Sequence, residues 1–108
     1  MQNYDNAQRT FLLAAKSNPQ SWSPFYYLGL FYGLAGPKRD LERSRKCLQK
    51  SIQLNPNEEC GSQLSDLFRL QGLHEENLAF LTSMTSKGQN QNWAQMRLGK
   101  IIVFQRAP

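Results

Sequence analysis

Hydrophobic residues recur along this chain at the three- and four-residue spacing of α-helices. The stretch around residue 28 is typical, because Phe25, Leu28, Gly29 and Tyr32 stand at i, i+3, i+4 and i+7 and so share one helical face. No convincing two-residue alternation of the kind found in half-buried strands is present. The pattern therefore predicts an all-α protein of about six short helices.

Capping residues and prolines set the expected limits of the first two helices. Asp5 is the predicted N-cap of the first, which ends at Asn18-Pro19 because the residue before proline is pushed out of the α region. Ser23 is the predicted cap of the second, with Pro24 in its first turn. A turn is expected at 33–37.

The third helix is expected from about Leu41 to Leu54, with Asp40 as its N-cap and Asn55-Pro56 as its end. Its predicted buried face consists of Leu41, Ser44, Leu48, Ser51 and Ile52. Three more helices are predicted, at about 60–71, at about 74–86 and from about residue 92. Gly72 separates the first two of these, and the polar loop 87–91 precedes the last.

A repeat underlies this order. The tetratricopeptide repeat (TPR) is a 34-residue helix–turn–helix with the pattern W-x2-L-G-x2-Y, then A-x3-F, then P. The chain fills these positions with Phe25, Leu28, Gly29, Tyr32, Ser44, Leu48, Ser51 and Pro56. Ala7, Phe11, Ala14 and Pro19 fill the second half of a preceding repeat. Pro19 and Pro56 are 37 residues apart, so we expect a three-residue insertion in the turn that joins the two helices.

The resulting prediction is a TPR-type α-solenoid of antiparallel helix pairs. Residues 1–20 would form the second helix of one repeat, 21–58 a full repeat, 59–91 a degenerate repeat, and 92–108 the first helix of a truncated repeat. Small residues are expected where helices approach most closely, namely Ala14, Gly29 and Ala79. The order of these parts predicts a segment of a longer solenoid, because neighbouring repeats complete each other's core.

Several less common features resemble the TPR scaffold subunit of the superkiller (Ski) complex. They are Tyr27-Leu28-Gly29 with Phe31-Tyr32, the stretch Arg45 to Lys50, the stretch Leu81 to Lys87, and Trp93. The resemblance covers nearly the whole chain but only a small part of a much longer protein. It carries no motif that assigns partner-contacting residues.

This resemblance implies a non-enzymatic scaffold in the cytoplasm, with a nuclear pool left open. Its implied partners are a DExH RNA helicase and WD-repeat propeller subunits, in an assembly that feeds messenger RNA to the exosome for 3′-to-5′ decay. The ATPase activity would belong to the helicase. The alternative is a generic TPR peptide-binding or co-chaperone-type adaptor, against which the absence of lysine and arginine in residues 24–32 argues.

Composition offers little support for an enzyme. Among 108 residues there is one histidine, His74, beside two acidic residues at a predicted helix start, and no GxxxxGK[ST] phosphate-binding loop. Cys47 and Cys60 fit no metal-binding spacing. No apolar run approaches the roughly 20 residues of a membrane helix. We therefore expect no catalytic residue, cofactor, metal or membrane contact.

Two sets of residues are candidates for contact with a partner. The net charge is +5, and Arg43, Lys46 and Lys50 stand three and four apart on one predicted helix face. They could bind RNA phosphates or an acidic protein surface, or simply be solvated. Tyr26 and Tyr27 could reach the concave groove of the repeat, although aromatics at helical spacing are first expected in a core.

Overall fold

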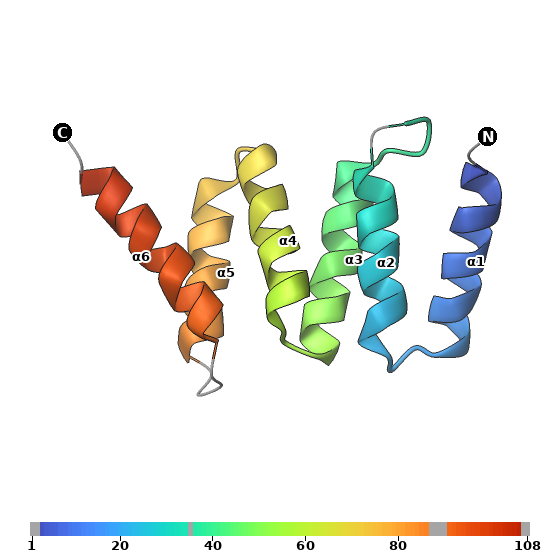
Figure 1. Cartoon of the computed structure of the whole chain (residues 1–108), viewed down its shortest axis with the longest axis horizontal. Helices are drawn as coiled ribbons and strands as arrows, with labels where there is room; N and C mark the ends of the chain where they lie inside the picture. The colour runs from blue at the N-terminus through green and yellow to red at the C-terminus, as the bar shows by residue number, and fades with distance from the viewer. Residues whose placement is uncertain (1–2, 35, 87–90, 107–108) are drawn as a thin grey trace. The chain divides into compact units, whose positions relative to one another are not determined.

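A computed structural model shows an all-α protein (Figure 1). It describes residues 3–34, 36–86 and 91–106, with side chains up to Val103 in the last segment. Within these residues there are six helices and no strand: α1 (Tyr4–Ser17), α2 (Trp22–Gly33), α3 (Leu41–Leu54), α4 (Glu58–Leu70), α5 (His74–Ser86) and α6 (Asn92–Arg106). The predicted fold class is confirmed. Apart from Gln91, the predicted polar loop 87–91 lies outside the described residues, as does Ala35 of the expected turn.

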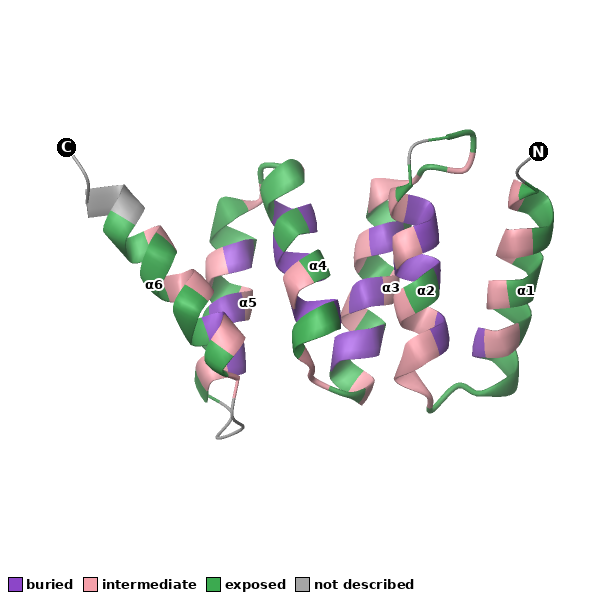
Figure 2. Cartoon of the chain, viewed as in Figure 1, coloured by how far each residue is buried: buried purple, intermediate pink, exposed green. Residues whose placement is uncertain are grey.

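The chain divides into two compact units, Met1–Pro56 and Asn57–Pro108. In the first, α2 lies antiparallel to α3 and also packs against α1 (Figure 1). In the second, α5 packs against both α4 and α6. Figure 2 shows that the buried residues of α2 and α3 are far more numerous than those of α1, which buries only Ala15. The α2–α3 pair is therefore the main core of the first unit.

Gly29 marks the closest approach within the α2–α3 pair. A Cβ atom at this position would lie 2.6 Å from Cγ and Cδ2 of the buried Leu48 and 3.3 Å from the carbonyl oxygen of Ser44. The Ser44 hydroxyl donates a 2.6 Å hydrogen bond to the carbonyl oxygen of Gly29. The predicted close approach at Gly29 is thus confirmed.

Helix caps are confirmed at one end and corrected at two others. The Asp40 carboxylate accepts a hydrogen bond from the Arg43 backbone N–H and caps α3 as expected. The cap of α1, however, is Asn3, while Asp5 lies in the first turn and pairs with Lys38 at 2.9 Å. The expectation for Asp5 was wrong because Asn3 already supplies the acceptor.

The second corrected cap is that of α2, which begins two residues earlier than predicted. Its N-cap is Ser21, whose side chain makes no capping hydrogen bond, and Ser23 lies inside the helix. Burial of Pro24 and packing of Trp22 against Tyr26, with ring centroids 5.8 Å apart, stabilise the added first turn. The Ser51 hydroxyl of α3 also donates a 3.0 Å hydrogen bond to the Trp22 carbonyl oxygen, so side-chain packing and this contact, and not a capping side chain, hold the first turn.

The α4–α5 pair repeats the α2–α3 pattern with different residues. Gly61, Leu64, Ser65 and Phe68 have the spacing of the Phe25 to Tyr32 stripe, and Asn77, Leu81 and Met84 have that of Ser44, Leu48 and Ser51; all seven are buried. Ser65 and Asn77 occupy the places of Gly29 and Ser44. The Ser65 hydroxyl donates to Asn77 Oδ1 at 2.7 Å.

The prediction that Ala79 lies at a close helix contact is wrong, because Ala79 is exposed. The buried face of α5 is instead formed by Asn77, Leu81 and Met84. On α4 the small residue at a tight contact is Gly61, where a Cβ atom would lie 2.2 Å from the Trp93 indole. The repeat pattern favoured Ala79 for the close contact, but the buried residues are Gly61 on α4 and Asn77 on α5.

Gly72 ends α4 in the left-handed conformation, with φ of 73°. The N–H of Leu73 donates to the carbonyl of Phe68 at 2.8 Å, as in a Schellman-type helix end.

We expect Gly72→Ala to lower the free energy of unfolding by roughly 1–2 kcal/mol, because a Cβ atom disfavours this conformation. Urea unfolding monitored by circular dichroism checks this value, and an unchanged stability would contradict the assigned role.

Candidate functional site

The predicted aromatic candidates lie on α2 and are only partly available to a partner. Tyr27 is 50% exposed and its ring stacks on Phe11, with centroids 6.1 Å apart and planes 11° apart. Tyr26 is half-buried and packs against Trp22 and Tyr27. Tyr27 is therefore available in part to a partner, whereas Tyr26 belongs largely to the packing of α2.

An apolar groove of about 370 Å³ runs between α1 and α2 beside Tyr27. It is lined by Asn3, Tyr4, Ala7, Phe11, Tyr27, Leu30, Phe31 and Leu34. Phe31 is buried beneath it, with its ring 6.2 Å from that of Phe11. The groove can cover an apolar side chain, but its lining offers little polar chemistry to define one.

The predicted basic candidates are exposed on α3. Lys46 and Lys50 lie on its surface, and Arg43 is held by two neighbours. Its Nε lies 3.5 Å from Asp40 Oδ2, and its guanidinium carbon lies 5.7 Å from the centroid of the Tyr32 ring. These contacts orient the Arg43 side chain, which is nevertheless exposed like those of Lys46 and Lys50.

Cys47 lies on the same helix, half-buried against the core of the first unit. Burial raises the pKa of its thiol, and the nearby Arg43 opposes this shift. We expect its alkylation by iodoacetamide to reach half-maximal rate at a higher pH in the folded than in the urea-unfolded chain, since the thiolate reacts. The Arg43→Gln variant should shift this midpoint further upward.

Mass spectrometry of the alkylated peptides separates Cys47 from the buried Cys60. The raised pKa of the Cys47 thiol also makes the free energy of unfolding depend on pH. Its contribution is fully present at pH values below the pKa of the unfolded chain, and it is lost as the pH rises through the pKa of the folded chain. Equal midpoints in the folded and unfolded chains would contradict the assigned burial effect.

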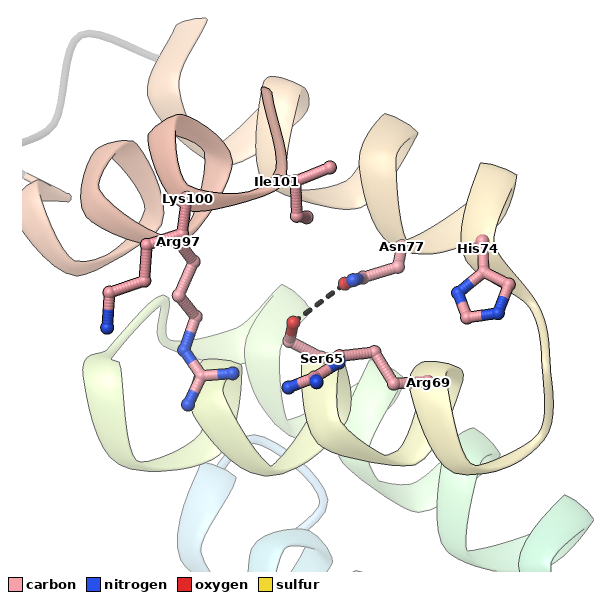
Figure 3. Close-up of a pocket in the computed structure, with 7 residues that line it drawn as sticks. All are labelled: Ser65, Arg69, His74, Asn77, Arg97, Lys100 and Ile101. Atoms are coloured by element: carbon pink, nitrogen blue, oxygen red, sulfur yellow. Dashed lines mark hydrogen bonds between the residues drawn. The ribbon is translucent and has the colours of Figure 1, made fainter. Parts of the chain in front are cut away.

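A larger and more polar pocket lies in the second unit, on α4, α5 and α6. Its volume is about 520 Å³, within the range of ligand-binding pockets. The lining residues, all labelled in Figure 3, are Ser65, Arg69, His74, Asn77, Arg97, Lys100 and Ile101. Three helices thus bring together cationic groups, a buried amide and one aliphatic side chain.

The arginines of this pocket are positioned by one carboxylate on α4. Arg97 Nη1 lies 2.8 Å from Asp66 Oδ1, and Arg69 Nη1 lies 3.9 Å from the same oxygen. The Arg97 side chain is 30% exposed, compared with 64% for Arg69. Asp66 therefore links α4 to α6 and holds Arg97 at the pocket.

Sequence reasoning missed this pocket. It assigned His74 to a solvated helix start, which agrees with its exposure, but gave no role to Asn77, Arg97 or Lys100. The signal was present in part, since Arg97 and Lys100 stand three apart and share a helix face. The equivalence of Asn77 to Ser44 depends on the helix register, which only the packing reveals.

In the part of the chain that the structure describes, no three or more histidine, cysteine, aspartate or glutamate side chains come together to hold a metal ion. Among the described helices, none is both long and apolar enough to span a membrane.

The chain is similar to a known repeat protein over most of its length. Over 93 residues the chain is 38% identical to tetratricopeptide repeat protein 37 of Xenopus laevis, a match that covers 82% of this chain. The chain spans about 6% of the length of that protein. No protein-family model matches. Most of the chain is therefore similar to a short stretch of a tetratricopeptide repeat protein, in agreement with its TPR-like helical repeat.

Proposed function

We propose that this chain is a non-enzymatic TPR scaffold segment that mediates protein–protein interactions. The observation that carries the proposal is the shared register of two helix pairs. Gly29 meets Ser44 in one pair and Ser65 meets Asn77 in the other, through hydrogen bonds of 2.6 and 2.7 Å. Such pairs serve as binding scaffolds because stacked repeats present extended surfaces to partners.

The same register supports a proposal for the repeat boundaries. We assign residues 1–20 to the second helix of a repeat, 21–58 to a full repeat, 59–91 to a degenerate repeat and 92–108 to the first helix of another. The serine-to-glycine contact spans 15 residues in the α2–α3 pair, and the corresponding contact spans 12 in the α4–α5 pair. This difference supports a three-residue insertion between α2 and α3.

At a finer level, the proposed assembly is the superkiller complex, in support of 3′-to-5′ messenger RNA decay by the cytoplasmic exosome. The proposed partners are its DExH RNA helicase and WD-repeat propeller subunits. Support comes from the resemblance at Tyr27 to Gly29, Arg45 to Lys50 and Trp93, together with the similarity to a TPR protein. The candidate residues that are exposed for contact are Tyr27, Arg43, Lys46 and Lys50.

The pocket on α4, α5 and α6 favours a second candidate function, that of a peptide-binding adaptor. The sequence argument against such an adaptor rested on the lack of cations in residues 24–32. Arg69 on α4 and Arg97 on α6 supply cations from two other helices. The adaptor function is compatible with a scaffold, since one surface can hold a peptide while others hold folded subunits.

Affinity purification of the tagged 108-residue chain from cytoplasmic extract tests the proposal. One sample is treated with nuclease and one is not, and bound proteins are identified by mass spectrometry. We expect the helicase and propeller subunits in both samples. The Gly29→Val variant serves as a control, because its disrupted α2–α3 pair should lose partners that recognise the folded repeat.

The other outcomes discriminate between the alternatives. Recovery of these subunits only without nuclease would indicate RNA as the bridge and would favour the basic face of α3. Recovery of chaperones alone, equally with the Gly29→Val chain, would contradict a folded scaffold segment.

A further inference from the structure

We propose that the pocket lined by Ser65, Arg69, His74, Asn77, Arg97, Lys100 and Ile101 binds side-chain carboxylates of an acidic peptide segment in a protein partner. This inference rests on the proposed protein-interaction function and names the chemistry of one partner. We refer to this site as the α4–α6 pocket.

The base of the α4–α6 pocket is a buried amide. Asn77 is 2% exposed, and its Oδ1 accepts a 2.7 Å hydrogen bond from the Ser65 hydroxyl (Figure 3). This bond orients the side chain and leaves the Nδ2 donor without a protein acceptor among the described residues, while Asn77 lines the pocket. The Nδ2 donor is accessible from the pocket, since it is not one of the fully enclosed atoms without a hydrogen-bond partner among the described residues. A ligand that brings an acceptor oxygen would satisfy it.

The charges around this amide specify an anion. Arg69, Arg97 and Lys100 line the pocket, and the one carboxylate paired with them is Asp66 among the described residues. Asp66 contacts Arg97 through Nη1 only, so other N–H groups of the guanidinium can take up a second carboxylate. Arginine binds carboxylates through paired, charge-assisted hydrogen bonds.

The lining favours a peptide over RNA. Figure 3 shows the guanidinium groups of Arg69 and Arg97 directed toward the same part of the pocket, with Lys100 near its edge. Recognition of single-stranded RNA relies on aromatic side chains that stack bases, and the described lining has only the imidazole of His74 for this purpose. Ile101 offers an aliphatic contact for a side-chain stem. An acidic peptide fits these features.

The test is fluorescence anisotropy with the purified 108-residue chain. The probe is a fluorescein-labelled glycine–serine peptide with a central run of glutamates, and its control carries glutamines at the same places. A labelled oligouridine is the third probe. We expect the glutamate peptide to bind at least roughly tenfold more tightly than the glutamine peptide, because charge-assisted hydrogen bonds are stronger than neutral ones.

Two matched double variants locate the binding. Arg69→Gln with Lys100→Gln removes two exposed charges from the pocket, and Arg9→Gln with Lys16→Gln removes the same charges from exposed positions on α1. We expect about a tenfold or greater loss of glutamate-peptide affinity in the first and less than about twofold in the second. Circular dichroism confirms that both remain helical.

A third variant probes the amide. Asn77→Asp keeps an oxygen to accept from Ser65 but replaces the Nδ2 donor with a second oxygen, so we expect glutamate-peptide binding to be lost.

Several results would overturn the inference. They are equal binding of the glutamate and glutamine peptides, equal weakening by the two double variants, or oligouridine binding that the pocket variant alone abolishes. Because this assay contains no helicase or propeller subunit, its failure is distinct from a failure of the co-purification experiment. The first would overturn the peptide site and leave the scaffold function in place, whereas the second would overturn the proposed assembly.

Discussion

Replacing Leu81 with alanine should destabilise the second unit by about 2–5 kcal/mol. Leu81 has 0% exposure and lies on the face of α5 between Asn77 and Met84, which are also buried. Truncation removes three carbon atoms from a closely packed site and leaves a cavity that the surrounding helices can fill only in part. Because isolated domains have small net stabilities, the change is a large share of the total.

Urea unfolding of the full chain, monitored by circular dichroism at 222 nm, a standard helix wavelength, measures this effect. Leu70→Ala on α4 is the matched control, because Leu70 is 63% exposed, and its expected change is within about 0.5 kcal/mol. Equal effects of the two substitutions would contradict the burial of α5 described above.

The Gly29→Val substitution is expected to lower the stability of the first unit by about 2–3 kcal/mol. Its Cβ atom would lie 2.6 Å from two carbons of Leu48, and Leu48 is only 2% exposed, so it has little room to move. The Ser44 carbonyl at 3.3 Å restricts the other side. Helix α2 must therefore shift away from α3, at the expense of the Ser44–Gly29 hydrogen bond.

Gly99→Ala provides the opposite expectation in the same assay. A Cβ atom at Gly99 meets no atom within 4 Å, so the higher helix propensity of alanine should stabilise the chain by up to roughly 1 kcal/mol. A stabilising Gly29→Val substitution would show that Gly29 does not mark a close helix contact.

Helix positions in this chain are largely encoded by local signals. Asp40 and Asn55-Pro56 bound α3 as predicted because a carboxylate cap and a proline act on the backbone near them. The break at Gly72 follows similarly from its left-handed φ. These helix limits depend on a few adjacent residues, so they could be predicted from the sequence without knowledge of the fold.

The register of the degenerate pair could not be derived in the same way. Ala79 matches the repeat consensus better than Asn77 does, yet Ala79 is exposed and Asn77 is buried. The decisive interactions are the Ser65–Asn77 hydrogen bond and the close packing of the Trp93 indole against Gly61. Both join residues on different helices, so they depend on the angle and offset of packing, which a single sequence does not specify.

The α4–α6 pocket could not be predicted from the sequence for the same reason. Arg69, Asn77 and Arg97 lie on three different helices, and none is unusual in its own segment. Their common chemistry arises only when α4, α5 and α6 pack together. The exposed face of α3, in contrast, was accessible to sequence reasoning because Lys46 and Lys50 share one helix.

Direct binding between purified components is the most stringent test of the central claim, that this chain is a protein-interaction scaffold segment. Isothermal titration calorimetry would add the nuclease-treated chain to the purified DExH helicase and, separately, to the WD-repeat propeller subunit. The account predicts saturable binding to at least one of them, lost in the Gly29→Val variant. Absence of binding to both by the folded chain, together with tight and strongly salt-dependent binding of RNA, would contradict it.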